Sequence, residues 1–173
     1  KDIDISFVGN MVYSPKRKRL LNAVIDHFPD RKIVVYGLYH PWYKGLFGWL
    51  ARPHKDIFKN ENIGSAESNV LYNRSRIALN IHQEFQKDGA NPRVFEICGT
   101  GTYQICDANP YIESIFPNGE IGLYHSEEEL LSLIEHALCN DMRDCTESAR
   151  KIVTELHSFD DRIRTVLEIL NEK

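Results

Sequence analysis

The sequence predicts an α/β fold: a Rossmann-like, doubly wound parallel sheet in a single domain that spans residues 1–173. Two observations predict it. Short apolar runs typical of strands alternate with segments of helical periodicity, and no internal repeat, low-complexity tract or linker interrupts the alternation. With 173 residues and 42% hydrophobic residues, the chain is long enough to bury one core. Strands joined through helices are parallel, because such crossovers are right-handed.

The first strand and helix have clear boundaries. The apolar run Ile3–Val8 ends at a Gly-Asn turn and is expected to be a strand. Ser14 is then the expected N-cap of a helix, with Pro15 at its first position. Its apolar face contains Leu20, Leu21, Val24, Ile25 and Phe28. Lys32–Tyr36 is rich in β-branched residues and predicts the second strand, which Gly37 closes.

The stretch Leu38–Gly64 is less regular, and within it we expect only a short strand near Asp56–Phe58. It also holds both tryptophans and an apolar patch. These residues either form a short helix packed on the domain or a surface that meets a neighbouring molecule. They are Trp42, Leu46, Phe47 and Trp49.

From Glu67 onward the alternation is regular again. The expected strands are Ile77–Ile81, Thr102–Cys106 and Glu120–Tyr124. The expected helices are Glu67–Arg74, Asn91–Cys98, Asn109–Phe116, one that begins after Ser126, one that includes Ala149–Leu156, and one that Ser158 caps. Ser126 and Glu129 have the spacing of a capping box.

Composition excludes several classes of protein. The formal net charge of -4 argues against a nucleic-acid partner, which usually requires a basic surplus. No apolar run approaches the roughly 20 residues of an integral membrane segment. The four cysteines lack C-x-x-C spacing, so we expect no zinc site and a reducing, cytoplasmic compartment. The sequence starts at Lys1, without Met, and we expect it to be a fragment cut at a domain boundary.

Four successive cations, Lys16 to Arg19, follow the expected cap of the first helix. Cations in a first helical turn oppose the helix dipole, whereas the free N–H groups there attract anions. A phosphate bound at this end would satisfy both. The alternative is that these side chains extend into water or form a nonspecific basic patch.

The segment from Asp88 to Glu96 (DGANPRVFE) combines a helix start with opposite charges. Asn91 is the expected cap, and Arg93 and Glu96 lie three residues apart, so their side chains share a face. Arg93 would bind phosphate oxygens, and Glu96 would accept hydrogen bonds from a ribose diol. The alternative is a surface ion pair of small energetic value.

Polar residues also follow the expected central strands. Asn80 and His82 follow one strand and Asp107 the next, at the edge where ligands bind in such sheets. His82 is either a donor to phosphate or sugar or a structural histidine. Gly99-Thr-Gly101 is best explained as a left-handed helix end, since the order of a dinucleotide fingerprint is absent. Asp2-Ile-Asp4 opens the first strand, opposite the expected site, so we expect no metal there.

Taken in order, these residues resemble the C-terminal domain of CgeB-like glycosyltransferases, within the glycosyl transferases group 1. The resemblance covers nearly the whole chain except roughly Leu38–Gly64. The matching segments are Ile5–Gly9, Leu20-Leu21, Leu71–Asn73, Ser75–Asn80, Gly89–Glu96, Cys98-Gly99, Asp107, Tyr124–Leu130, His157–Phe159 and Arg162.

The resemblance implies a GT-B architecture, in which this chain is the C-terminal half and binds a nucleotide diphosphate sugar. Asp88 and Glu96 have the spacing of two acidic residues in related enzymes, the second of which contacts the donor ribose. By the same resemblance, Arg17 and Arg93 contact the diphosphate. The residues expected to bind the donor are Gly9, Arg17, Tyr72, Asn80, His82, Asp88, Arg93 and Glu96, with Tyr72 and Asn80 shaping the nucleoside and sugar pocket.

The resemblance therefore implies a metal-independent glycosyltransferase with no cofactor besides its donor substrate. The general base would lie in an N-terminal acceptor-binding domain of the same protein, so the fragment alone would bind donor without turnover. One alternative is a nucleotide-binding module that lacks transferase activity. Another is an interaction domain that works through Trp42, Phe47 and Trp49, and a third, weaker one is a sugar-phosphate isomerase or epimerase.

Overall fold

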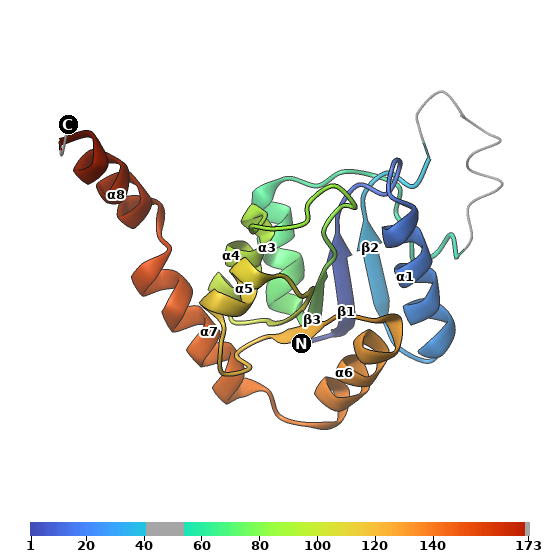
Figure 1. Cartoon of the computed structure of the whole chain (residues 1–173). Coiled ribbons are helices and arrows are strands. Elements are labelled where there is room, and N and C mark those ends of the chain that lie inside the picture. Colours follow the sequence, from blue (N-terminus) through green and yellow to red (C-terminus); the bar gives the residue numbers. More distant parts are fainter. Residues whose placement is uncertain (41–53, 172–173) are drawn as a thin grey trace.

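A computed structural model of the chain describes residues 1–40 and 54–171. Its centre is a sheet of five parallel strands in the order β2-β1-β3-β4-β5 (Figure 1). The strands are β1 (Ile3–Val8), β2 (Ile33–Tyr36), β3 (Ser75–Asn80), β4 (Tyr103–Asp107) and β5 (Gly122–Tyr124). The expected doubly wound parallel sheet is thus confirmed.

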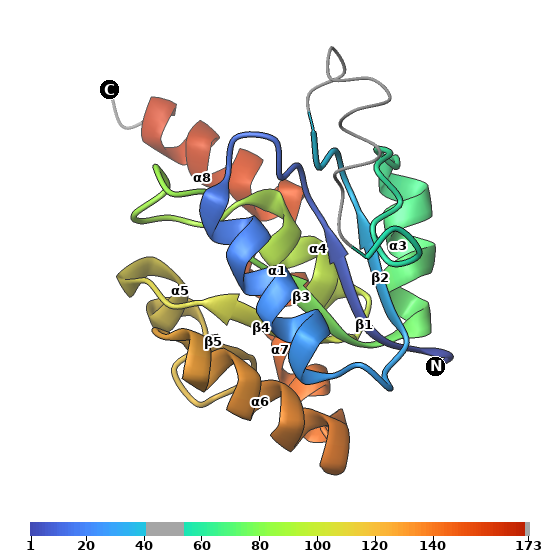
Figure 2. The ribbon, with the colours of Figure 1, turned by 90° about the vertical axis from the view of Figure 1, so that its right-hand side faces the viewer.

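Helices cover both faces of this sheet. The helices are α1 (Pro15–His27), α3 (Ser65–Arg74), α4 (Pro92–Gly99), α5 (Pro110–Ile115), α6 (Glu127–Cys139), α7 (Arg143–Leu156) and α8 (Phe159–Asn171). Helices α1 and α6 lie side by side on one face, and α3, α4 and α7 lie on the other (Figure 2). The strands are apolar on both faces because both are covered.

The main core fills the space between the sheet and the α1–α6 layer. From the strands, Ile5, Phe7 and Leu79 point into it, and the apolar face of α1 meets them as the helical spacing predicted. The residues from α1 and α6 are Leu20, Leu21, Val24, Ile25, Leu130, Ile134, Ala137 and Leu138. A second core joins α4, α5 and α7 to the other face, so each layer is anchored separately.

Local signals explain most helix boundaries. The Ser14 hydroxyl accepts the N–H of Arg17 at 3.2 Å, and the Asn109 side chain accepts that of Ile112 at 3.0 Å. At α6, Ser126 accepts the N–H of Glu129, as the capping box requires. The Glu129 carboxylate, however, accepts the N–H of His125, one residue before the cap, at 2.7 Å.

One expectation about local structure was wrong. The expected strand near Asp56–Phe58 is only a single bridge, which pairs Phe58 with Val35 at the outer edge of β2. Asn91 is the N-cap of α4 as expected, although its side chain makes no capping hydrogen bond. The apolar patch with Trp42 and Trp49 lies outside the described residues.

Helix α8 differs from the other helices because it extends away from the body of the domain (Figure 1). It has no buried residue. Its apolar side chains recur at helical spacing on one face and are all more than half exposed: Phe159, Ile163, Val166, Leu167 and Leu170. Nothing in the described part of the chain covers this face.

Candidate functional site

The candidate site lies where β1 and β3 end. The chain passes from β1 to β2 on one side and then to β3 on the other, so the strand order switches direction between β1 and β3. Ligands bind at the carboxyl ends of strands at such a switch point. Gly9, an expected donor contact, directly follows β1 and donates its N–H to the carbonyl of Tyr36 at 2.9 Å. A Cβ at Gly37 would lie 1.9 Å from the Gly9 carbonyl oxygen, so the two loops touch through their backbones.

Arg17 places a fixed positive charge at this switch point. Its side chain is 5% exposed, and its guanidinium donates to the carbonyls of Ile81 at 2.7 Å and Asn10 at 2.8 Å. Burial, with a smaller contribution from the charge of Arg93, lowers the pKa of Arg17 to about 10. Arg17 therefore remains charged at neutral pH. Because a guanidinium carries five N–H groups, these two bonds leave donors for an anion.

The amino end of α1 is occupied by a carboxylate from the same chain. Glu84 accepts the hydroxyl of Ser14 and the N–H of Lys16, both at 2.8 Å. These bonds, despite the opposing effect of desolvation, lower the pKa of Glu84. Glu84 sits where the sequence predicted a phosphate, so a phosphate at this end has to displace it. Sequence reasoning missed Glu84, because its partners lie about 70 positions away.

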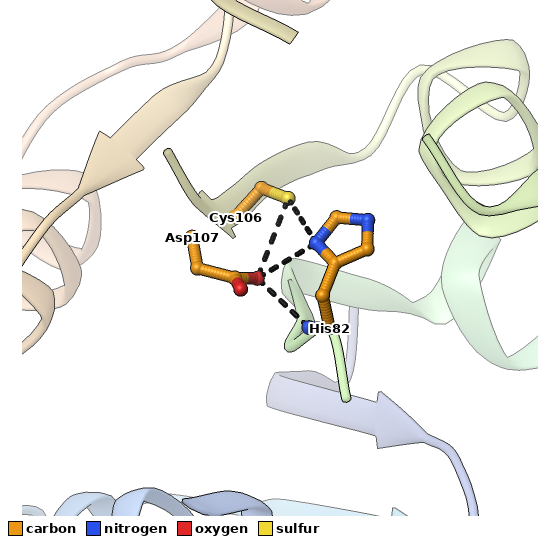
Figure 3. Close-up of side chains that lie close together, drawn as sticks. All are labelled: His82, Cys106 and Asp107. Atoms are coloured by element: carbon orange, nitrogen blue, oxygen red, sulfur yellow. Dashed lines mark hydrogen bonds and ion pairs between the residues drawn. The ribbon is translucent and has the colours of Figure 1, made fainter. Parts of the chain in front are cut away.

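His82 and Asp107 form a buried hydrogen-bonded network at the ends of β3 and β4 (Figure 3). Asp107 accepts the N–H of His82 at 2.8 Å, its ring Nδ1–H at 2.9 Å and the ammonium of Lys16 at 2.7 Å. Burial favours the protonated carboxyl, but these hydrogen bonds outweigh it and lower the pKa of Asp107 to about 2. His82 is fully buried, with Nε2 facing the N–H of Asn91 at 3.5 Å. With Nδ1–H donating to Asp107 and Nε2 accepting from Asn91, the neutral ring has no N–H left for a ligand.

Cys106 completes a group of metal-ligand types in this network. Its Sγ lies 3.7 Å from Nδ1 of His82 and 3.9 Å from Oδ1 of Asp107. All three ligand atoms lie within 4.8 Å of one another, the one such group found among the described residues. However, Asp107 already accepts three N–H groups, and burial raises the pKa of the Cys106 thiol well above its usual range. The contacts thus describe a neutral thiol beside a histidine–aspartate pair.

Asn80 and Tyr72, expected to shape the nucleoside and sugar pocket, are each 1% exposed. The side-chain amides of Asn80 and Asn91 bond each other reciprocally at 2.9 and 3.2 Å, which explains why Asn91 does not cap α4 with its side chain. A direct contact between Asn80 and a ligand requires this pair to separate. The Tyr72 hydroxyl is buried without a hydrogen bond to any described residue.

Arg93 and Glu96 lie together on the outer side of α4. Arg93 is half-buried and Glu96 is exposed, and the ion pairs among the described residues include neither. Burial raises the pKa of Tyr72 to about 12, and the charges of Arg93 and Glu96 both act on it. Glu96 is therefore free to accept hydrogen bonds and is not held in an internal ion pair.

A pocket of about 450 Å³ adjoins Glu96 between α4 and the joint of α7 and α8. The Arg162 guanidinium lies 4.3 Å from the ring centroid of Phe95, and the ring of His157 lies 5.3 Å from it. Sequence reasoning had singled out His157 and Arg162 only through the family resemblance. The structure brings both against the helix that carries Glu96.

The remaining motifs have structural explanations. Asp88 is exposed and accepts the N–H groups of Gly89 at 2.8 Å and Tyr111 at 3.3 Å, so it ties the β3–α4 loop to α5. Gly101 has a φ of +68°, which confirms the left-handed connection after α4. Asp2 forms ion pairs with Arg74 and Lys32 at the amino end of β1, away from the candidate site.

The fold is that of a glycosyltransferase domain of the GT-B class, as solved structures show. A glycosyltransferase from Rickettsia africae is 18% identical and aligns over 99% of this chain and 48% of its own, with a TM-score of 0.74. The sucrose-phosphate synthase of Thermosynechococcus elongatus is 13% identical and aligns over 99% of this chain and 45% of its own, with a TM-score of 0.73. The pneumococcal O-GlcNAc transferase GtfA, solved in complex with UDP and GlcNAc, is 16% identical and aligns over 98% of this chain and 36% of its own, with a TM-score of 0.66.

The chain belongs to the glycosyl transferase-like family, whose sequence model matches residues 16–168. It spans less than half the length of each of the three solved glycosyltransferases. No protein of curated function matches the sequence. Among the described helices, none combines the length and apolar character of a bilayer-spanning segment.

Proposed function

We propose that this chain is the donor-binding domain of a GT-B glycosyltransferase that transfers a sugar from a nucleotide diphosphate to an acceptor. One observation carries the proposal. The chain belongs to a glycosyl transferase-like family. In it, the unpaired carboxylate of Glu96 lies on the same helix as Arg93, and the charge of Arg93 acts on the buried Arg17 at the switch point. Two cations beside a free carboxylate fit a diphosphate joined to a ribose.

In this proposal the diphosphate binds between Arg17 and the amino end of α4. The guanidinium of Arg93 contacts its oxygens, and Glu96 accepts hydrogen bonds from the ribose diol. These groups are fixed before the reaction, so they stabilise the negative charge that develops on the leaving diphosphate. No metal ion is required for this step, because the two guanidinium groups supply the positive charge.

The apolar face of α8 supports a second domain in the same protein. The chain spans less than half of the solved glycosyltransferases named above, and five large apolar side chains on α8 are exposed. Contiguous apolar surface of this kind marks an interface. We propose that an N-terminal acceptor-binding domain covers this face and supplies the general base. The isolated chain then binds the donor but does not transfer its sugar. We also propose that the protein is a cytoplasmic member of the CgeB-like enzymes.

Titration of the isotope-labelled chain with UDP, GDP, ADP and dTDP tests donor binding. We expect one of them to shift the backbone amides of Arg93 and Glu96 in NMR spectra. Failure of all four to shift either amide would contradict the proposal.

The ribose contact is tested with Glu96→Gln, which keeps the shape of the side chain but removes its charge. Because charge-assisted hydrogen bonds are the strong ones, we expect affinity for the preferred ribonucleotide to fall about tenfold. The 2′-deoxy analogue has one hydroxyl fewer and is expected to lose less. Glu155→Gln, on the exposed side of α7, is the matched control and should leave both affinities unchanged.

A nucleotide-binding module without transferase activity is the second candidate. It requires only the groups proposed to bind the nucleotide, Arg17, Arg93 and Glu96, and no general base. The full-length protein distinguishes the two functions. Binding of sugar nucleotide without transfer or hydrolysis would favour the module.

A further inference from the structure

A second polar pocket opens at the carboxyl ends of β4 and β5, and we call it the edge pocket. It has a volume of about 360 Å³ and lies between the amino end of α1, the β3–α4 loop and the residues that follow β4 and β5. Gln83, Gln86, Lys87, Asp107 and Tyr124 are among the residues that line it. None of the residues expected from sequence to contact the donor lines this pocket.

The edge pocket contains hydrogen-bonding groups that the fold leaves unused. The side-chain amides of Gln83 and Gln86 form no hydrogen bond with any described residue. The hydroxyl of Tyr124 is also unpaired within the described part of the chain, although this side chain is only 3% exposed. A buried polar group without a partner is rare in a native protein and points to a group that the protein alone does not provide.

The chemistry of this lining suits a hydroxylated ring. An amide offers two donors and an acceptor, and the Tyr124 hydroxyl adds one donor, so the pocket can bond hydroxyl groups in either direction. The charges that line the pocket balance, because Lys16 pairs with Asp107 at 2.7 Å, Arg19 pairs with Glu127 at 3.2 Å, and Lys87 and Glu84 have opposite charges. The pocket is therefore better suited to a neutral, polar ligand than to a second phosphate.

The position of the edge pocket relates it to the proposed donor. Helix α4 carries Glu96 on one face of the sheet, whereas α1 borders the edge pocket from the other face. Arg17 lies near both, since its neighbour Lys16 lines the edge pocket and the charges of Arg93 on α4 and of Asp107 in the pocket both act on its guanidinium. A nucleotide sugar is linear, with the ribose at one end and the sugar at the other. With the ribose at Glu96 and the diphosphate at Arg17, the sugar extends toward the edge pocket.

We propose that the edge pocket receives the sugar ring of the donor, and that Gln83 and Gln86 bind its hydroxyl groups. This inference rests on the proposed function. It assigns recognition of the sugar to the β3–α4 loop and the ends of β4 and β5, and recognition of the nucleotide to α4.

The test compares each sugar nucleotide with the bare diphosphate. UDP, UDP-glucose, UDP-galactose, UDP-N-acetylglucosamine, GDP and GDP-mannose are titrated calorimetrically into the 173-residue chain and into the double variant Gln83→Ala/Gln86→Ala. We expect the double variant to bind the bare diphosphate within about twofold of the unmodified chain. For the preferred sugar nucleotide, the loss of two hydrogen bonds should weaken binding at least about fivefold. In NMR spectra of the unmodified chain, the side-chain amide signals of Gln83 and Gln86 should shift when the sugar nucleotide is added but not when the bare diphosphate is added.

The matched control is Asn140→Ala, which removes an exposed amide at the carboxyl end of α6, and it should change neither affinity. If no diphosphate binds, the proposed function fails and this inference with it. If the diphosphate binds but the double variant loses no affinity for any sugar nucleotide, the inference alone is overturned. A loss of bare diphosphate binding equal to that of the sugar nucleotide overturns it as well, because the amides then act on the phosphates.

Discussion

Replacing Asp107 by asparagine tests the network that holds the ends of β3 and β4 together. The carboxylate accepts two N–H groups of His82 and the ammonium of Lys16, and its side chain is only 13% exposed. The asparagine side chain would keep one oxygen for His82. Its NH₂ group, however, would face the ammonium of Lys16, where a donor meets a donor.

The pKa of Asp107 sets the size of the effect. A fall from 3.8 to about 2 means that the fold prefers the ionised carboxyl over the neutral one by roughly 2.5 kcal/mol. Because asparagine resembles the neutral form, we expect Asp107→Asn to lower the free energy of unfolding by about 2–3 kcal/mol at pH 7. A carboxyl with a depressed pKa stabilises the fold above its ordinary pKa. The difference between the two proteins should therefore persist down to about pH 4, fall to about half at pH 3, and vanish below pH 2.

Urea unfolding followed by circular dichroism at pH 7, 4 and 3 measures this difference. The control is Asp141→Asn, because Asp141 also pairs with a cation, Arg143, at 2.6 Å but is exposed. We expect the control to leave the midpoint of unfolding unchanged. A difference between wild type and Asp107→Asn below about 0.5 kcal/mol at pH 7, or one that does not depend on pH, would refute the assigned network.

Three further predictions concern the surrounding residues. Gly37→Ala should lower the free energy of unfolding by about 3 kcal/mol or more, because φ is +130° and the new Cβ would meet the Gly9 carbonyl. The control Gly119→Ala, at φ +78° with open space around the new Cβ, should lower it by only about 1–2 kcal/mol. Equal losses for the two variants in urea unfolding would contradict this prediction. Glu84→Gln should tighten binding of the preferred nucleotide diphosphate several-fold, because it removes a negative charge that acts on Arg17, the proposed diphosphate contact; weaker binding in calorimetry would contradict this. Iodoacetamide should label the exposed Cys139 in the folded chain but not the buried Cys98, because burial raises the pKa of the Cys98 thiol to about 12. Mass spectrometry of digested samples measures the labelling, and label on Cys98 but not on Cys139 would contradict the prediction.

The sequence was sufficient to predict the sheet and the helices that cover it. Runs such as Ile3–Val8 are rich in apolar residues, since nearly all of the strand is buried, and this pattern is visible without knowing the partners. The caps at Ser14 and Ser126 act within three residues and were equally visible. The expected strand at Asp56–Phe58 was wrong because a short apolar run cannot reveal that it pairs at a single position on the outer edge of the sheet.

The candidate site was predicted less completely, because its contacts join residues that are distant in sequence. The position of Asn80 at the ligand edge of the sheet was correct, but its pairing with Asn91 depends on how the β3–α4 loop folds back. Histidine is a residue type that often binds ligands, but His82 is fully buried like a core residue. Only the structure decides between a ligand-binding and a structural role. That Arg93 and Glu96 share a face of the helix follows from their spacing of three, but the exposure of Glu96 depends on how α4 packs and is known only from the structure.

The two loops that border the candidate site differ in how firmly they are held. The β1–α1 loop is fixed by the backbone contact of Gly9 with Gly37 and by the bond from Arg17 to Asn10. The β3–α4 loop is tied to α1 through Glu84 and to α5 through Asp88, but its Phe85 side chain is exposed and the side-chain amides of Gln83 and Gln86 bond nothing in the described chain. Substitutions at positions 83, 85 and 86 should therefore disturb the fold little, whereas substitutions in the β1–α1 loop should damage it. New substrate preferences should evolve, or be engineered, through these three positions while the scaffold beneath them stays constant.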